Sequence, residues 1–426
     1  MLDAGDLMTG NIICNIEYKG AEGGALVKMM NMIGYDGMTC GNHEFDKHKS
    51  NLEQLINIAD FEVYSANLLD ENRKSFTKEK YHIYNVSGLR IGVIGLTPHP
   101  LKGLVNPHNL DEYNSYDPVE AVNSTVEKID PPTDLIIVLS HLGIDADREL
   151  AGKVENVDVI VGGHSHTKLE EPELINGIII VQAGSYSSYL GRLDLTVAGD
   201  SVMAYSGLLI PAFSDSIAID TKLADFIDSF EQMIYLEYGR VIGHLKCDWI
   251  PEILQESNIG NWLTDAMRFN TKTDVGFINS GAIRKSLPAG PITVKDIMEI
   301  IPFFDYVEIF ECSGEQLMTI IHNNAKAQAD QSREVLQVSG IEYSWKIDNG
   351  AVNIVKATVG GKPLDPKKVY KVSSLDYVVL NYQKYFGFKP ENVVSANVII
   401  YDLLIEAVKE SGEIDSRIEH RINKVG

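Results

Sequence analysis

The chain has 426 residues, of which 44% are hydrophobic and 23% are charged, and it carries a formal net charge of −23 with an isoelectric point near 4.8. This length exceeds one ordinary core, so we expect two domains. The acidic excess argues against binding to nucleic acid polymers or anionic membranes, because both depend on clustered lysine and arginine. No segment approaches the roughly 20 apolar residues of a membrane span, and no signal-peptide pattern opens the sequence.

Strand-like segments near the start of the chain lead into polar side chains. Residues 1–6 read as the end of a strand followed by a loop that carries Asp6. An apolar stripe with helical spacing at residues 26–33 precedes a strand at 37–40, and this strand leads into Asn42. The sequence therefore predicts that at least two strand ends in this region deliver possible ligands.

Further along, short apolar runs predict strands. They cover residues 61–68, 90–96, 134–139, 157–161 and 178–181. The run at 134–139 leads into His141, and the run at 157–161 leads into His164 and His166. Because ligands bind outside the carboxyl ends of the strands in open α/β sheets, we expect these side chains to lie close together.

The hexapeptide Gly41–Asp46 contains an amide, an imidazole and two carboxylates, which is a dense set of chemically active groups. One interpretation is a catalytic loop in which His43 and Asp46 act on a substrate. The alternative is a structural loop in which Asn42 begins a turn and His43 is a capping or core histidine. The hexapeptide alone does not decide between them, and the other strand ends favour the catalytic interpretation.

Apolar residues with helical spacing separate the two halves of the chain, from Ile217 to about Tyr238. We predict a first domain at residues 1–216, an interdomain helix at 217–240 and a second α/β domain at 241–426. In the second domain the sequence predicts a strand at 276–279 and helices at 258–269, with Asn258 as the cap, and at 294–301, 314–327 and 398–409.

Five side chains that follow strands form a candidate metal site: Asp6, Asn42, His141, His164 and His166. This mixture of nitrogen and oxygen ligands suits Zn, Mn, Fe or Co, and the absence of cysteine argues against a structural zinc site. A carboxylate can bridge two ions, and two ions about 3.5–4 Å apart can hold a phosphoryl group and acidify a water molecule. The ions would also supply the positive charge that this acidic protein lacks.

Four sequence blocks of the first half resemble the calcineurin-like metallophosphoesterases: Gly5-Asp6, Gly41-Asn42-His43-Glu44, Ser140-His141-Leu142-Gly143 and Gly163-His164-Ser165-His166. Three later blocks are similar to the C-terminal domain of the 5′-nucleotidase/UDP-sugar hydrolase family: Asn258-Ile259-Gly260-Asn261, Asn279-Ser280-Gly281-Ala282-Ile283-Arg284 and Pro302-Phe303. The resemblance implies a four-layer α/β/β/α sandwich, a linker helix and a smaller α/β substrate-binding domain.

The resemblance also implies roles for the individual residues. Asp6 would bridge two divalent ions. Asn42, His141 and His164 would complete the coordination of one ion, and His166 would bind the other. His43 would stabilise the leaving side of the phosphoryl group, and Asp46 would orient His43. Glu44 is expected to be structural or to support the metal ligands.

One departure from the family concerns the metal site. Family members carry an Asp-x-His motif on their first strand, whereas the only Asp-x-His in this sequence is Asp46-Lys47-His48, inside the catalytic block. We therefore expect one complete ion site and a second site that keeps only Asp6 and His166. A truncated sequence and a naturally degraded enzyme are both open as explanations.

For the substrate, the resemblance implies that Asn279, Gly281 and Arg284 grip phosphate and ribose and that Phe303 and Tyr377 enclose the base. A guanidinium binds phosphate with two hydrogen bonds, and aromatic faces stack on bases with little selectivity. The alternative for the two aromatic residues is a place in the core. Bulky residues at 380–384 replace an expected glycine-rich loop, so the exact nucleotide-like substrate stays open.

The sequence thus predicts a metal-dependent phosphoester hydrolase acting on small nucleotides, with closure of the two domains around the substrate. The alternative is a non-catalytic nucleotide-binding protein with an incomplete metal centre. The resemblance implies a periplasmic or extracellular location if a signal lies upstream, and otherwise a cytoplasmic one; the sequence does not choose, nor does it give the oligomeric state.

Overall fold

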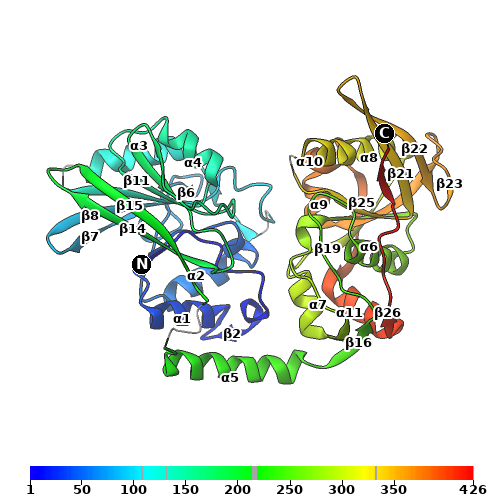
Figure 1. The fold of residues 1–426 in the computed structure, drawn as a ribbon, viewed down its shortest axis with the longest axis horizontal. Coiled ribbons are helices and arrows are strands. Elements are labelled where there is room, and N and C mark those ends of the chain that lie inside the picture. The colour runs from blue at the N-terminus through cyan, green and yellow to red at the C-terminus, as the bar shows by residue number, and fades with distance from the viewer. Residues whose placement is uncertain (107–108, 131, 214–217, 332, 426) are drawn as a thin grey trace. The chain divides into compact units, whose positions relative to one another are not determined.

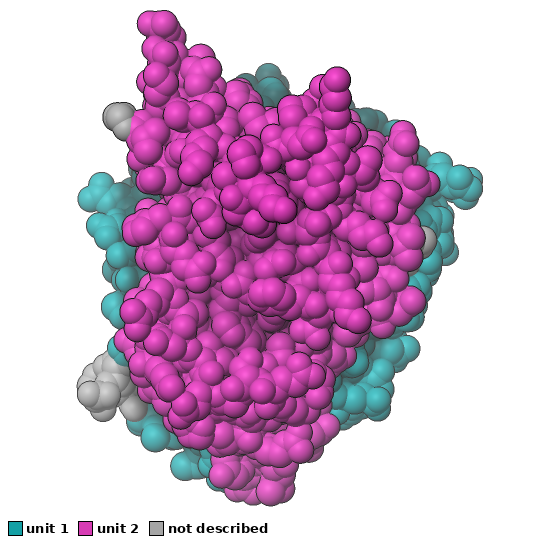
Figure 2. All heavy atoms as spheres, turned by 90° about the vertical axis from the view of Figure 1, so that its right-hand side faces the viewer, with its two compact units in different colours: residues 1–9, 13–228 teal, residues 10–12, 229–426 magenta. Residues whose placement is uncertain are grey.

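The computed structural model describes residues 1–106, 109–130, 132–213, 218–331 and 333–425 (Figure 1). The chain divides into two compact units, which are coloured separately in Figure 2. Unit 1 comprises Met1–Thr9 and Ile13–Asp228, and unit 2 comprises Gly10–Ile12 and Ser229–Gly426. The predicted domain border between residues 216 and 217 lies outside the described residues. None of the described helices combines the length and the apolar character needed to span a membrane.

In its described residues, unit 1 is built on two main sheets. The smaller sheet has the order β1-β4-β5, and its strands run parallel. The larger sheet has the order β12-β13-β11-β10-β8-β7, with parallel pairing from β13 to β8 and antiparallel strands at both edges. The strands are β1 (Leu2–Asp3), β4 (Gly37–Met38), β5 (Glu62–Val63), β7 (Tyr81–Val86), β8 (Leu89–Leu96), β10 (Leu135–Ser140), β11 (Val159–Gly162), β12 (Glu173–Ile175) and β13 (Ile178–Val181).

Helices cover the outer faces of both sheets, which Figure 1 shows for α3 and α4 on the larger sheet. The smaller sheet packs against α1 (Gly24–Ile33) and α2 (Lys49–Ile58), and the larger one packs against α3 (Pro118–Ile129) and α4 (Ile144–Ala151). Helix α3 begins after Asp117, whose carboxylate accepts hydrogen bonds from two backbone amides of its first turn.

Three apolar clusters fill the spaces between these layers. Along β10, Ile136 and Val138 face the helices, whereas Ile137 and Leu139 face the other sheet. This alternation follows from the two-residue period of a strand and explains the continuous apolar run in the sequence. Two clusters between sheets and helices and one between the sheets give the four layers α/β/β/α, which confirms the predicted architecture of the first half.

The prediction of one continuous strand at residues 61–68 is wrong. The structure has two short strands there, β5 and β6 (Leu68–Leu69), and β6 pairs with β9 (Asn114–Ser115) in a separate ladder. Between them, the backbone amide of buried Ser65 donates to the Thr77 hydroxyl at 3.0 Å, in place of a partner on a neighbouring strand. Side-chain hydrogen bonds of this kind compete with sheet pairing.

The rest of unit 1 includes short strands and a long hairpin. These are β2 (Glu17–Tyr18), β3 (Ala21–Glu22), β14 (Tyr189–Val197) and β15 (Val202–Pro211). Helix α5 (Thr221–Tyr238) then leads into unit 2, with Phe230 and Ile234 as its buried residues. The predicted start of this helix at Ile217 is not among the described residues.

The central sheet of unit 2 has the order β20-β17-β24-β19-β25, and smaller sheets have the orders β18-β16-β26 and β23-β22-β21-β27. The strands are β16 (Val241–Leu245), β17 (Val275–Asn279), β18 (Gly290–Thr293), β19 (Tyr306–Ser313), β20 (Leu336–Ser339), β21 (Ile341–Asp348), β22 (Ala351–Val359), β23 (Lys362–Pro363), β24 (Val369–Leu375), β25 (Glu391–Ile399), β26 (Glu413–Ile414) and β27 (Ile422–Lys424). The helices are α6 (Asn258–Thr271), α7 (Val294–Ile300), α8 (Gly314–Asp330), α9 (Asp376–Leu380), α10 (Tyr382–Tyr385) and α11 (Ile400–Ser411).

Two local predictions in unit 2 are corrected. Ser257 caps α6, because its hydroxyl accepts from the Gly260 amide, whereas Asn258 accepts from the Ile250 amide. Residues 398 and 399 belong to β25, so α11 begins at Ile400. Asn258 is engaged by the segment before the helix, and Ile399 pairs with Tyr306 of β19, so these contacts set the two helix starts.

Candidate active site

Four of the five predicted metal ligands lie just beyond the carboxyl ends of parallel strands in unit 1. Asp6 follows β1, Asn42 follows β4, His141 follows β10, and His164 follows β11. Asp6 and His164 have left-handed backbone conformations, with φ of 64° and 68°, and His166 has φ of 57°. Such conformations are uncommon outside glycine and cluster at functional sites.

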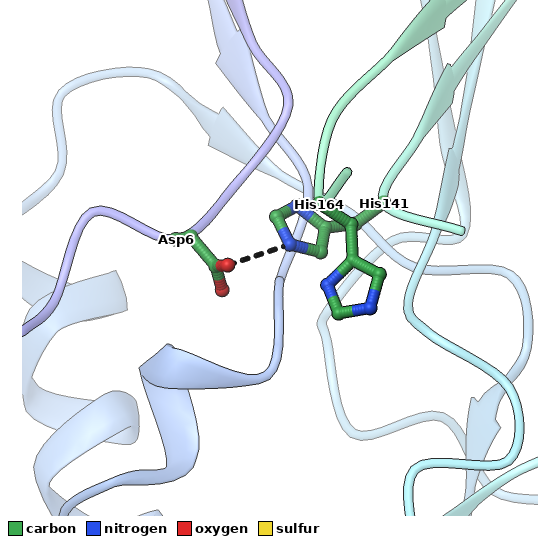
Figure 3. A group of neighbouring side chains, drawn as sticks. All are labelled: Asp6, His141 and His164. Carbon is green, nitrogen blue, oxygen red and sulfur yellow. Dashed lines mark ion pairs between the residues drawn. The ribbon is translucent and has the colours of Figure 1, made fainter. Parts of the chain in front are cut away.

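Asp6, His141 and His164 converge in space, and Figure 3 shows their side chains pointing toward one another. One ligand atom from each lies within 4.8 Å of the others. The Asp6 Oδ2 atom is 2.8 Å from Nε2 of His141, and the two imidazole centroids are 5.2 Å apart. The structure therefore brings together three of the five predicted ligands as one group.

The residues around this group fit a divalent cation. Oδ1 of Asn42 is buried and has no hydrogen-bond partner among the described residues. A buried polar atom without a partner lowers the stability of a fold, and a bound cation would supply the missing partner here. Nδ1 of His141 donates a hydrogen bond to the Ala4 carbonyl, and this bond turns Nε2 toward the Asp6 carboxylate.

Burial and mutual charge set the protonation of these side chains. Burial, together with the charge of His141, lowers the pKa of His164 to about 4, so His164 is a neutral imidazole at neutral pH. Burial opposes ionisation of both Asp6 and His141, but their mutual attraction outweighs it. It lowers the pKa of Asp6 and raises the pKa of His141. His164 and Asp6 are therefore in the neutral and ionised forms that bind metal ions, whereas His141 would release its Nε2 proton when an ion binds.

His43 and Asp46 form a hydrogen-bonded pair beside the group. Nδ1 of His43 is 2.7 Å from Oδ2 of Asp46, and the Thr9 hydroxyl donates to the same carboxylate oxygen. The His43 backbone amide donates to Oδ1 of Asp6 at 2.9 Å. These contacts fix the imidazole next to the predicted bridging carboxylate.

Glu44 holds together the two loops that carry Asp6 and Asn42. Its buried carboxylate accepts hydrogen bonds from four backbone amides, those of Asp6, Leu7, Met8 and Gly41. Burial, with the nearby charge of Asp6, raises the pKa of Glu44 to about 7. The predicted supporting role of Glu44 agrees with these contacts.

We expect Glu44→Gln to lower the free energy of unfolding of the chain by about 2–4 kcal/mol, because one carboxylate oxygen becomes an amide group that cannot accept the amide protons facing it. Urea denaturation followed by circular dichroism measures this change. Glu53→Gln, at an exposed residue of α2, is the matched control and should leave the stability within about 0.5 kcal/mol. Equal stability of the two variants would contradict the role of Glu44.

Gln182 supports the loop that carries His164 and His166. It directly follows β13, and its Oε1 accepts from the Thr167 amide at 2.5 Å and from the Ser165 hydroxyl at 2.9 Å. Its Nε2 donates to the Gly163 carbonyl at 2.7 Å. The sequence analysis did not select Gln182 as a site residue, although the pattern of a strand followed by a polar residue marks it.

His166 is not part of the group formed by Asp6, His141 and His164. Its ring packs edge-on against Tyr186, with centroids 5.6 Å apart. Its assignment to a second ion therefore stays a prediction from the family resemblance.

The predicted substrate-binding residues of unit 2 lie near the end of β17. Asn279 is its last residue, and Oδ1 of this side chain is buried without a hydrogen-bond partner in the described part of the chain. The guanidinium of Arg284 lies over the Phe303 ring, 5.1 Å from its centroid. A flat cation over an aromatic face is a favourable pair that keeps the guanidinium edge available to a ligand anion.

Tyr377 lies in α9 and packs edge-on against Tyr385, with ring centroids 6.3 Å apart. Burial, together with the negative charge of Glu334, raises the pKa of Tyr377 to about 12, and the charge of Arg284 acts in the opposite direction. Tyr377, Arg284 and Glu334 therefore interact with one another in unit 2. Neither Glu334 nor Tyr385 was selected from the sequence.

Comparison with known proteins agrees with this architecture. Residues 1–168 match the family described as calcineurin-like phosphoesterase, and residues 241–389 match the 5′-nucleotidase C-terminal domain. The fold and the ligand group thus define a two-domain metallophosphoesterase, a class that uses divalent metal ions to hydrolyse phosphoesters.

Relatives that align with most or all of the chain identify the family. A 5′-nucleotidase of Vibrio parahaemolyticus is 30% identical over 416 residues, covering 85% of this chain and 72% of the relative. The 5′-nucleotidase precursor of Thermus thermophilus superposes with a TM-score of 0.86 at 28% identity, covering 100% of this chain and 90% of the other. The chain belongs to the 5′-nucleotidase family.

A longer relative is the trifunctional nucleotide phosphoesterase protein YfkN of Bacillus subtilis. It is 26% identical over 481 residues that include 100% of this chain, but this chain spans only 32% of its length.

Proposed function

We propose that this protein hydrolyses phosphomonoester or phosphodiester bonds in nucleotides or nucleotide-like compounds. The observation that carries the proposal is the group formed by Asp6, His141 and His164 beside the unpartnered Oδ1 of Asn42. When bound there, divalent ions supply an acidified water molecule and positive charge for the phosphoryl oxygens.

Each residue then has a defined task. Asp6, Asn42, His141 and His164 would hold one ion, and Asp6 and His166 would contribute to a second. His43 stabilises or protonates the departing alkoxide, and Asp46 keeps its imidazole oriented through Nδ1.

In unit 2 we assign substrate binding to five residues, Asn279, Gly281, Arg284, Phe303 and Tyr377. The Arg284 guanidinium suits an anionic group of the ligand, and the rings of Phe303 and Tyr377 suit stacking on a base. The names of the relatives, several of which are 5′-nucleotidases, support a nucleotide as the substrate.

Phosphate release from a set of nucleoside 5′-monophosphates, cyclic nucleotides and nucleotide sugars tests the proposal. We expect release with Mn²⁺ or Co²⁺, loss of at least about a hundredfold in rate after chelation with EDTA, and recovery when the ion is returned. No metal-dependent release from any of these compounds would contradict the enzymatic function, and nucleotide binding without release would favour the non-catalytic alternative.

A further inference from the structure

A carboxylate that the sequence analysis did not select lies among the predicted substrate-binding residues of unit 2. Glu334 precedes β20, and its side chain is 22% exposed. Its Oε1 accepts a hydrogen bond from Nζ of Lys384 at 2.7 Å and another from the hydroxyl of Tyr385. Two partners therefore fix the orientation of the carboxylate through one of its oxygens.

The second oxygen, Oε2, faces Gly281. A Cβ atom built on Gly281 would lie 2.8 Å from Oε2 of Glu334 and 3.6 Å from Nδ2 of Asn279. A side chain at residue 281 would therefore collide with the carboxylate, and glycine leaves the space open. Oε2 accepts no hydrogen bond from the described residues, so it is available as an acceptor.

The surroundings keep Glu334 negatively charged. Burial alone would raise the pKa of this carboxyl, but the ammonium of Lys384 and the hydroxyl of Tyr385 outweigh burial and lower it, with a smaller contribution from Arg284. A carboxylate held by Lys384 and Tyr385 attracts further hydrogen-bond donors and repels a second anionic group.

We propose that Glu334 is a specificity-determining residue whose Oε2 accepts a hydrogen bond from a pentose hydroxyl of the bound nucleoside. The inference rests on the proposed nucleotide substrate. A nucleoside whose base lies between Phe303 and Tyr377 carries its sugar hydroxyls next to the base, and hydroxyls are the neutral donors that this acceptor requires.

Isothermal titration with adenosine and with 2′,3′-dideoxyadenosine tests the inference, because neither compound contains phosphate. We expect the wild-type protein to bind adenosine about tenfold more tightly, since a hydrogen bond to a charged acceptor is lost in the dideoxy compound. In Glu334→Gln this preference should fall to about twofold to threefold, because the acceptor becomes neutral. A purely structural role would weaken the binding of both compounds equally.

Tyr385→Phe is the matched control, since it removes one partner of Oε1 but keeps the carboxylate. Its preference for adenosine should stay within about twofold of the wild-type value. The inference is overturned if Glu334→Gln keeps the wild-type preference, or if the wild-type protein has no preference or binds neither compound at millimolar concentration. Phosphate release from adenosine 5′-monophosphate is measured separately, so failure of the inference is distinguishable from failure of the proposed function.

Discussion

Asp6→Asn is expected to lower phosphate release by about a thousandfold or more and to remove bound metal ions. Asp6 is the carboxylate of the described ligand group and faces Nε2 of His141 at 2.8 Å. Asparagine keeps the shape of the side chain and an oxygen for the His43 backbone amide, so the loop keeps its conformation. The negative charge is lost, and with it the several kcal/mol that a bound ion contributes to the transition state.

Metal content by plasma mass spectrometry and Mn²⁺ affinity by isothermal titration are measured beside the rate. The matched control is Asp145→Asn, because the Asp145 side chain is 92% exposed in the same unit and forms its ion pair with Arg148, away from the ligand group. It should keep its metal ions and its activity. Retention of both in Asp6→Asn would exclude Asp6 as a ligand.

His43→Ala is expected to lower kcat for nucleoside monophosphates by about a hundredfold to a thousandfold, the usual contribution of a positioned acid. Metal content should not change, because His43 is not one of the three grouped ligands. The loss should be much smaller with p-nitrophenyl phosphate, since its phenolate departs without protonation. The ratio of the two losses therefore measures the action of His43 on the leaving group.

The matched control for this variant is His48→Ala. The His48 side chain is 50% exposed, and its ring nitrogen contacts Ser50 at the start of α2. We expect its kcat to stay within about twofold of the wild-type value for both substrates. An equal loss for the two substrates in His43→Ala, together with loss of metal, would assign a structural role to His43.

The convergence of Asp6, His141 and His164 could be predicted from the sequence, because strand periodicity and the parallel sheet act together. Apolar runs located β10 and β11 to within two residues, and a parallel sheet places their carboxyl ends at one edge. His141 and His164 therefore could be predicted as neighbours. The short strands β5 and β6 could not, because Ser65 depends on a side chain 12 residues away.

The supporting residues were harder to predict, because their partners are distant in sequence. Gln182 acts on a loop 15 to 19 residues earlier in the chain, and Glu334 meets Lys384 and Tyr385 about 50 residues later. Their side chains follow no periodic pattern that reveals such contacts. The fold has to be known before these residues can be recognised.

The four amides held by Glu44 have a consequence for the motions of the chain. Three of them lie in the loop after β1 and one in the loop after β4, so their amide protons belong to irregular backbone and yet are shielded from solvent by a single buried carboxylate. Hydrogen exchange at these amides requires that the carboxylate be released, and its release frees all of them together. We therefore expect the edge of the sheet that carries Asp6 and Asn42 to open as one cooperative unit.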